Sequence, residues 1–370
     1  MTPRQKPKAP VRRNPGGLRV VAIGGGTGLS TLLKGLKRYC APPGELPTRG
    51  SSSSRNSAEQ LISELCAVVT VTDDGGSSGR LRKELNMLPP GDIRNCIVAL
   101  SEDEALLSRL FQHRFERGSG LEGHSFGNLF LAALTSVTKD FSEAVRLSSE
   151  ILVTRGHIYP STTSNVELEA LLEDGTRVSG ETKITASKGK IRELLLVPAA
   201  VEPLPQTLEA IARADLITVG PGSLFTSLVP NLLVKGVTRA ILDSSALKVY
   251  VCNLMTQANE SLGLSAADHI CALNRHAQAE RIFDYAIINR APASQEMKAK
   301  YALEGASQIV VDLDAIESMG IRPVLGDYLV EDGVARHATD RLTGDLLALA
   351  MDAKAGKEPR AEPRGASPVH

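Results

Sequence analysis

The sequence predicts an α/β fold of the Rossmann-like kind, with a mostly parallel sheet covered by helices and a small antiparallel hairpin excursion. Short apolar runs alternate with helical patterns along most of the chain, which is typical of a parallel sheet with helices on both faces. A glycine-rich loop directly follows the first apolar run, at residues 18–23. A block around residues 166–197 breaks this rhythm, because it alternates and contains the turn signal Asp174-Gly175.

The expected elements follow in chain order from this rhythm. The first strand, at residues 18–23, leads through its glycine loop into a helix at 28–39, and residues 67–72 form a β-branched, buried strand. A polar loop is expected at 73–82 and an antiparallel excursion at about 157–198. Helical patterns occupy residues 93–100, 104–115, 126–137, 141–152 and 340–353, and later apolar runs lie at 216–219, 239–242, 249–252, 285–288 and 309–311.

The composition favours one large domain and excludes some partners. The 370 residues carry 42 Lys and Arg against 42 Asp and Glu, so net charge gives no reason to expect nucleic acid or a membrane surface. No apolar run approaches the roughly 20 residues of a membrane span. The five cysteines lack Cys-x-x-Cys spacing, which favours reduced thiols and a cytoplasmic location.

The domain limits come from composition. Residues 1–17 are basic and rich in proline, and we expect a disordered tail there rather than a secretory signal. A single domain is expected over 18–353, with a flexible Pro-, Gly- and Ser-rich insertion at 41–57. Residues 354–370 are expected to form a second disordered tail.

The first loop, Gly24-Gly25-Gly26-Thr27-Gly28, is predicted to bind phosphate. Glycines allow backbone N–H groups to approach a ligand closely, and the following helix adds partial positive charge at its N-terminus. The loop does not fit the Gly-x-Gly-x-x-Gly fingerprint, since Leu29 or Thr31 falls on its third glycine. Because this dinucleotide fingerprint fails, an NAD-linked enzyme is disfavoured. The loop does not fit a P-loop either.

The second loop places two carboxylates, Asp73 and Asp74, directly after a buried strand. Such acids could hold a ribose, bind Mg²⁺ together with substrate phosphates, or act as a base. Arg80 and Arg82, a few residues on, suit a phosphate or a carboxylate. The residues alone leave these alternatives open.

Three further loops could contribute residues to a ligand-binding site. Residues 90–95 resemble a helix start and include Asn95. Residues 123–128 match Gly-x-Ser-x-Gly, but no strand precedes them, so a serine hydrolase is disfavoured and a helix N-terminus offering Ser125 and Asn128 to an anion is preferred. Gly220 to Ser223 follow a strand and open a second possible anion site.

Together these loops resemble the YvcK/CofD-like family, and most closely its gluconeogenesis factor branch. The resemblance covers roughly residues 18–353 and spares the tails and the insertion. It rests on several motifs in register, which are Gly-Gly-Gly-Thr-Gly at 24–28, Asp-Asp-Gly-Gly-Ser-Ser-Gly-Arg at 73–80, Pro-Gly-Asp-Ile-Arg-Asn at 90–95, Gly-His-Ser-Phe-Gly-Asn at 123–128, Gly-Pro-Gly-Ser-Leu-Phe-Thr at 220–226, Pro-Asn-Leu-Leu-Val at 230–234 and Cys-Asn-Leu-Met-Thr-Gln at 252–257.

The resemblance implies a cytoplasmic bacterial protein that binds UDP-sugars, notably UDP-N-acetylglucosamine. Such proteins are linked to growth on gluconeogenic carbon and to cell shape through peptidoglycan synthesis. The related CofD branch instead transfers a 2-phospholactyl group from a guanylyl donor to a deazaflavin, with Mg²⁺. We therefore expect a ligand-binding regulator, with a Mg²⁺-dependent phosphotransferase as the alternative.

The resemblance also implies roles for individual residues. Gly25, Gly26, Thr27 and Gly28 would hold the diphosphate. Asp73 and Asp74 would also bind the ligand and would hold a metal, and they would serve in catalysis if the protein is a transferase. The other expected ligand-binding residues are Arg80, Asn95, Asn128, Gly222, Ser223, Tyr301 and Arg336. The expected partners are proteins of cell-wall synthesis that the sequence does not identify, and a homodimer is our expectation.

Overall fold

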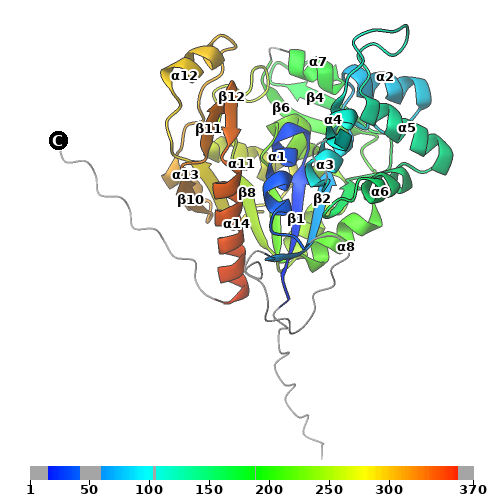
Figure 1. The fold of residues 1–370 in the computed structure, drawn as a ribbon. Helices are drawn as coiled ribbons and strands as arrows, with labels where there is room; N and C mark the ends of the chain where they lie inside the picture. Colours follow the sequence, from blue (N-terminus) through cyan, green and yellow to red (C-terminus); the bar gives the residue numbers. More distant parts are fainter. Residues whose placement is uncertain (1–15, 42–59, 103–105, 188, 357–370) are drawn as a thin grey trace, which may run out of the picture.

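A seven-stranded parallel sheet forms the centre of the molecule in the computed structural model, which describes residues 16–41, 60–102, 106–187 and 189–356 (Figure 1). The strand order is β10-β9-β8-β7-β1-β2-β3, and every neighbouring pair is parallel. The strands are β1 (Leu18–Gly24), β2 (Ile62–Val69), β3 (His157–Pro160), β7 (Leu216–Val219), β8 (Leu247–Val251), β9 (Tyr285–Asn289) and β10 (Arg322–Gly326).

The order of the strands creates one switch point. The chain moves outward from β1 to β2 and β3, and then returns to the other side of β1 to add β7 and the later strands. Val21 of β1 therefore pairs with Cys66 of β2 on one side and with Ile217 of β7 on the other. In open parallel sheets, ligands bind at the carboxyl ends of the strands beside such a reversal.

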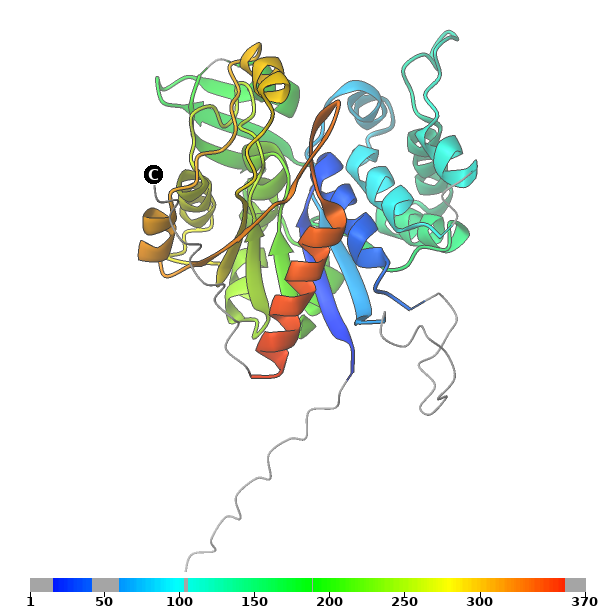
Figure 2. The same cartoon turned by 60° about the vertical axis from the view of Figure 1, so that its left-hand side comes forward.

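Helices cover both faces of the sheet. On one face, α1 (Gly26–Lys37) packs between α3 (Gly91–Leu100) and the long C-terminal α14 (Thr339–Lys354), as Figure 2 shows for α1 and α14. The other helices are α2 (Gly76–Leu85), α4 (Leu106–Gln112), α5 (Phe126–Thr138), α6 (Phe141–Ile151), α7 (Glu181–Ala186), α8 (Pro205–Arg213), the π-helix η1 (Leu224–Leu228), α9 (Val229–Leu233), α10 (Val237–Asp243), α11 (Ala266–His276), α12 (Gln295–Ala302) and α13 (Leu313–Ser318).

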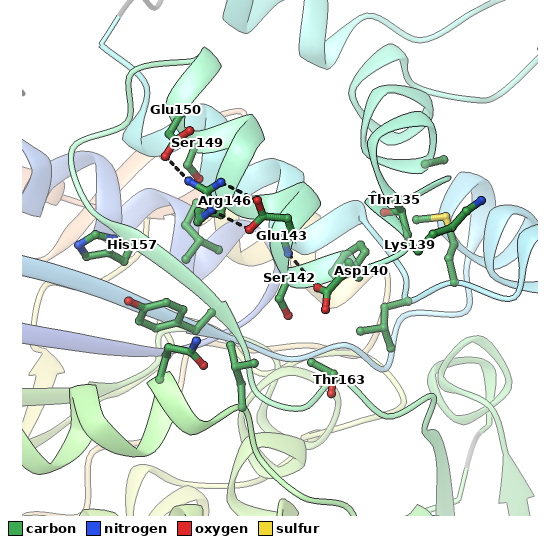
Figure 3. A pocket seen from close by; sticks show the side chains of 18 of the residues that line it. Thr135, Lys139, Asp140, Ser142, Glu143, Arg146, Ser149, Glu150, His157 and Thr163 are labelled. Carbon is green, nitrogen blue, oxygen red and sulfur yellow. Dashed lines mark hydrogen bonds and ion pairs between the residues drawn. The ribbon is translucent and has the colours of Figure 1, made fainter. Parts of the chain in front are cut away.

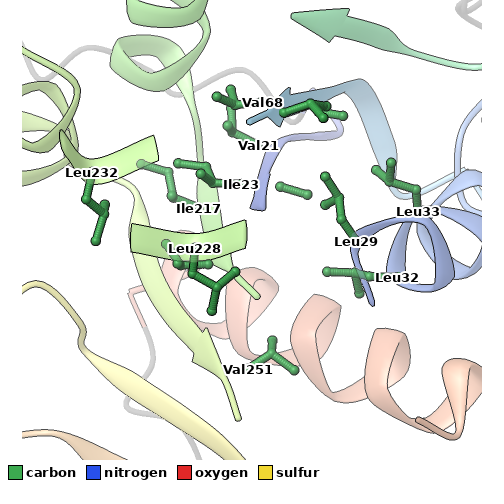
Figure 4. Packing of buried hydrophobic residues seen from close by; sticks show 14 of the residues in the cluster. Val21, Ile23, Leu29, Leu32, Leu33, Val68, Ile217, Leu228, Leu232 and Val251 are labelled. Carbon is green, nitrogen blue, oxygen red and sulfur yellow. The ribbon is translucent and has the colours of Figure 1, made fainter. Parts of the chain in front are cut away.

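The core lies where β1 and β7 pack against the helices that follow them. Strands covered on both faces bury successive residues, which explains the continuous apolar run of β1. Figure 4 shows this packing, in which every labelled side chain is at most 4% exposed. The labelled residues are Val21, Ile23, Leu29, Leu32, Leu33, Val68, Ile217, Leu228, Leu232 and Val251. Burial on this scale fixes the two loops that leave β1 and β7.

Two small antiparallel sheets stand outside the main sheet. β4 (Glu167–Leu172) pairs with β5 (Arg177–Ser179) and β6 (Ile191–Val197), and β11 (Leu329–Asp332) pairs with β12 (Val334–His337). In the turn between β4 and β5, Gly175 has φ +86° and Asp174 accepts a hydrogen bond from the amide of Thr176 at 2.9 Å. The predicted excursion is thereby confirmed as a feature of the fold.

The predicted α/β class with a mostly parallel sheet is confirmed, and several elements differ from expectation. The polar loop expected at 73–82 is largely α2, and the apolar run at 239–242 lies in α10 rather than in a strand. The second strand runs over Ile62–Val69 instead of 67–72, and His157–Pro160 joins the main sheet instead of the excursion. Residues 309–311 form no named strand, whereas β10, β11 and β12 were not predicted.

The predicted tails and insertion lie mostly outside the described residues. The described chain begins at residue 16, stops at 41, resumes at 60 and ends at 356. Within these residues, no helix combines the length and the apolar character that crossing a membrane would require.

Candidate functional site

The loops after β1 and β7 touch each other at the switch point. α1 begins at Gly26, whose φ is +61°, and its cap Gly25 offers no side-chain hydrogen bond. A Cβ on Gly28 would lie 2.4 Å from the carbonyl oxygen of Pro221, which is an impossible contact with rigid backbone. Residue 28 must therefore be glycine for the two loops to lie this close.

Asp92 joins this junction from the N-terminus of α3. A Cβ on Gly25 would come within 2.7 Å of the Asp92 Oδ2 atom, so the carboxylate lies against the glycine loop. It accepts a hydrogen bond from the backbone N–H of Gly26. Burial, together with the nearby charge of Asp73, raises the pKa of Asp92 to about 6. Asp92 was not predicted as a site residue, although its motif was recognised.

The two adjacent acids of the second loop have different environments. Asp73 accepts a hydrogen bond from the amide of Gly75 at 2.9 Å, and its Oδ2 atom faces Gly91. Asp74 accepts hydrogen bonds from Thr182, from the amide at 2.8 Å and from the hydroxyl at 2.6 Å. Asp74 therefore holds the start of α7 and the antiparallel sheet, whereas Asp73 faces the site.

Glu181 brings a further carboxylate to Asp73. Both residues line a shallow hollow of about 360 Å³, together with Thr182, Thr185 and Ala186. Burial and the charges of Asp73 and Asp92 raise the pKa of Glu181 to about 9. Sequence reasoning missed Glu181 because it lies in the antiparallel excursion, far from any motif. Glu181 lies in the first turn of a short helix, next to Thr182, which is hydrogen-bonded to Asp74. The sequence does not show this position.

No cluster of three or more His, Cys, Asp or Glu residues suited to a metal occurs in the part of the chain that the structure describes. A Mg²⁺ ion at this site would therefore be held by one or two carboxylates, such as Asp73 and Glu181, with oxygens of a bound ligand completing its shell.

The loop after β7 is already braced by side chains. Asn253 accepts from the amide of Gly222 at 3.1 Å and donates to its carbonyl at 2.7 Å. Gln257 donates to the Ser223 hydroxyl at 2.8 Å, which leaves the Ser223 proton available as a donor. The buried Glu260 carboxylate accepts from the amides of Phe225 and Thr226, at 2.7 and 3.0 Å. These two amides are thus not free for the second anion site that was expected here.

The predicted residues of the remaining early loops lie around the N-terminus of α5. Asn128 donates from its side chain to the Ser77 hydroxyl at 3.1 Å, and its own amide donates to Ser125, the cap of α5. Arg80 donates to the carbonyl of Glu122 at 2.8 Å, and Asn95 accepts from Arg94 at 2.8 Å. Arg94, the partner of Asn95, interacts electrostatically with Asp92 and Asp73.

Tyr301 and Arg336 are brought together by α12 and the β11–β12 hairpin. The Tyr301 hydroxyl accepts from the amide of Ala335 at 3.2 Å, next to the exposed Arg336. His337 hydrogen-bonds through Nε2 to the carbonyl of Cys252 at 3.0 Å, and burial lowers the pKa of His337 to about 4. Since Cys252 precedes Asn253, the hairpin is anchored at the same edge of the sheet as the Gly222 loop.

A separate cavity of about 1290 Å³ lies between α5, α6 and β3 (Figure 3). Arg146 crosses it with hydrogen bonds to Glu143 and Glu150. None of the predicted site residues lines this cavity, so it is distinct from the site at the switch point.

The fold and these loops define a Rossmann-like α/β protein with a glycine-rich loop at its switch point. Residues 20–329 match the family model described as 2-phospho-L-lactate transferase CofD. The gluconeogenesis factor of Halalkalibacterium halodurans is 45% identical over 330 residues, covering 89% of this chain and 95% of that protein. The gluconeogenesis factor of Bacillus subtilis is 43% identical over 333 residues, covering 90% and 98%.

A crystal structure of a Bacillus halodurans protein superposes with a TM-score of 0.82 at 44% identity, covering 90% of this chain and all of that chain. The chain belongs to the gluconeogenesis factor, or YvcK-like, family within the CofD-like superfamily.

The raised pKa of Glu181 predicts a pH-dependent stability. The carboxyl group has an ordinary pKa near 4.5 when unfolded and about 9 when folded, so between these values the folded protein binds the extra proton. The free energy of unfolding therefore falls as pH rises through this window. Glu181→Gln should raise the free energy of unfolding at pH 8 by about 1–3 kcal/mol, with little change at pH 4.

Urea denaturation at pH 4, 6 and 8 measures this effect, with the exposed Glu317→Gln as the matched control that should change nothing. Identical pH profiles for wild type and Glu181→Gln would contradict the proposed environment of Glu181.

Proposed function

We propose that this protein binds a UDP-sugar, with UDP-N-acetylglucosamine as the preferred ligand, and acts as a cytoplasmic regulator of growth on gluconeogenic carbon and of cell shape through peptidoglycan synthesis. The observation that carries the proposal is the contact between the glycine loop and the Pro221–Gly222 loop at the switch point. Nucleotide ligands occupy this position in sheets of this order. The relatives' printed name, gluconeogenesis factor, supports the regulatory role.

The start of α1 supports a diphosphate at this place. The cap residue Gly25 has no side chain, the first turn contains no acidic residue, and the Asp92 carboxylate of α3 takes only the amide of Gly26. The first amides of a helix have no partner within the helix, so those of Thr27 and Gly28 are suited to phosphate oxygens. The helix has 12 residues, which is long enough for its dipole to favour a negative charge at this end.

The β11–β12 hairpin supports a ligand that extends beyond the diphosphate. Arg336 is exposed and takes part in no ion pair within the described residues, so its guanidinium is available to a ligand. Tyr301 fixes the neighbouring backbone at Ala335. A ligand that reaches from the glycine loop to this hairpin would carry groups on both sides of its diphosphate, as a UDP-sugar does. The protein partners and the homodimer stay predictions.

UDP-N-acetylglucosamine is expected to raise the melting temperature of the protein, because a ligand that binds only the folded state stabilises it. Arg336→Ala should weaken this binding by about tenfold, the effect of losing one charge-assisted hydrogen bond. Thermal-shift titration checks both, with Arg239→Ala on α10 as a control of the same charge change.

No shift at millimolar UDP-N-acetylglucosamine beside a clear shift with NAD would contradict the proposal. An unchanged affinity in Arg336→Ala would remove that residue from the site.

The alternative is a Mg²⁺-dependent transferase of the 2-phospho-L-lactate transferase type. The family model that the chain matches favours it, as do Asp73 and Glu181, which line one hollow, and Asp92, which lies against the glycine loop. Asp73 and Glu181 would hold the ion, which would neutralise phosphate charge. Asp92 would orient the loop through its hydrogen bond to Gly26.

The transferase alternative predicts a phospholactyl product when the protein is incubated with a guanylyl-phospholactate donor, the deazaflavin acceptor and Mg²⁺. Asp73→Asn should abolish the product, whereas Asp74→Asn should lower the stability first, because Asp74 holds Thr182. Mass spectrometry of the product decides, and its absence from the wild-type reaction would exclude this alternative.

A further inference from the structure

Three arginines gather where the N-terminal parts of α2, α3 and α5 meet. Arg80 lies on α2, Arg94 lies on α3, and Arg114 forms a β-bridge with Ser125, the cap of α5. Arg80 donates to the carbonyl of Glu122, and Arg114 donates to that of Gly123. Within the described residues, none of the three guanidinium groups forms an ion pair with a carboxylate.

The cluster is built into the fold. The Arg94 side chain crosses the first turn of α5, where a Cβ on Gly127 would come within 2.8 Å of its Cγ and Cδ atoms. His124, just before the cap, is hydrogen-bonded through Nδ1 to the Ser77 hydroxyl at 2.9 Å. The same hydroxyl accepts from Asn128 at 3.1 Å. The absence of a side chain at residue 127 thus makes room for Arg94.

Two polar atoms in this cluster are buried without a partner. The Nε atom of Arg94 has a hydrogen to donate, and the Oδ1 atom of Asn128 can accept one, yet neither forms a hydrogen bond. Asn128 is only 2% exposed. Buried polar atoms are almost always paired, so this donor and this acceptor indicate a bound molecule that offers both an acceptor and a donor.

The charges point to a negative ligand. Burial, and then the charge of Arg114, lowers the pKa of Arg94, although the charges of Asp92 and Asp73 act in the opposite direction. Burial, and then Arg80, lowers the pKa of His124, with Glu84 opposing. Positive groups that repel one another in this way are stabilised by an anion. The N-terminus of the 13-residue helix α5 adds its dipole to the same place.

We propose that Arg80, Arg94 and Arg114, with His124 at the start of α5, form an anion-binding subsite for the phosphate or carboxylate group of a second small molecule. The subsite is separate from the glycine loop, because its arginines lie on α2, on α3 and just before α5. The carboxylate of Asp92 accepts the Gly26 amide and interacts electrostatically with Arg94. Guanidinium groups bind both kinds of anion through paired hydrogen bonds. The proposal goes beyond the proposed UDP-sugar site and does not depend on it.

Isothermal titration of the full chain with inorganic phosphate, glycerol 3-phosphate and acetate tests the subsite, at a fixed ionic strength. We expect the arginine cluster to bind one molecule of phosphate or acetate, apart from any phosphate at the glycine loop, and the tighter of the two ligands identifies the group. The exposed Arg114→Gln should weaken binding by about tenfold or more, and Arg94→Gln should do the same. Arg117→Gln, on the same loop and also exposed, is the matched control that should bind as wild type does.

A second titration in saturating UDP-N-acetylglucosamine separates the two sites. We expect the phosphate binding that Arg114→Gln weakens to keep its dissociation constant, and loss of that binding would overturn the proposal. The absence of binding by all three probes would also overturn it, as would equal losses in Arg114→Gln and Arg117→Gln. The first titration contains no nucleotide, so its result does not depend on the UDP-sugar proposal. Failure of the UDP-sugar proposal would be detected separately, by thermal shift.

Discussion

The close approach of two backbone segments at the centre of the sheet controls the geometry of the candidate site. Gly28, in the first turn of α1, lies against the carbonyl of Pro221, and Gly25 lies against Asp92 and Thr70. These contacts leave no room for a Cβ, and the packing of β1 and β7 beneath them fixes the backbone. The start of α1, the start of α3 and the loop after β7 are therefore held at one point, where Asp92 accepts from the Gly26 amide and the amides of Thr27 and Gly28 follow.

The charges around this point are arranged by parts of the chain that are distant in sequence. Asp74 holds Thr182 and so attaches the antiparallel excursion, which in turn places Glu181 beside Asp73. At the helix start after β7, the Glu260 carboxylate accepts from two amides, whereas at the start of α1 the Asp92 carboxylate accepts from that of Gly26. The amides of Thr27 and Gly28 are therefore the ones suited to an external anion. The excursion is part of the site and not an appendage.

Much of the fold could be predicted from the sequence, because local patterns determine it. The buried run of β1, its glycine loop and the turn at Asp174-Gly175 each follow from a short stretch of residues. α2 was missed because Gly76, Ser77, Ser78 and Gly79 have low helix propensity, and tertiary packing overrides that preference. Glu181, Glu260 and Asn253 could not be identified as site residues, since their roles arise from contacts across about 30 to 110 residues. Nor could the sequence separate Asp73, which accepts from Gly75, from Asp74, which accepts from the distant Thr182.

The central claim, that the site exists because residue 28 has no side chain, is tested most directly by Gly28→Ala. Alanine is the better helix former, and at Gly344 of α14, where an added Cβ meets nothing within 4 Å, the same change should stabilise the protein by about 0.5–1 kcal/mol. At residue 28 the Cβ would strike the Pro221 carbonyl, so we predict a lower free energy of unfolding and loss of UDP-N-acetylglucosamine binding, measured by urea denaturation and thermal shift. A Gly28→Ala protein as stable as Gly344→Ala, with unchanged ligand binding, would contradict the account.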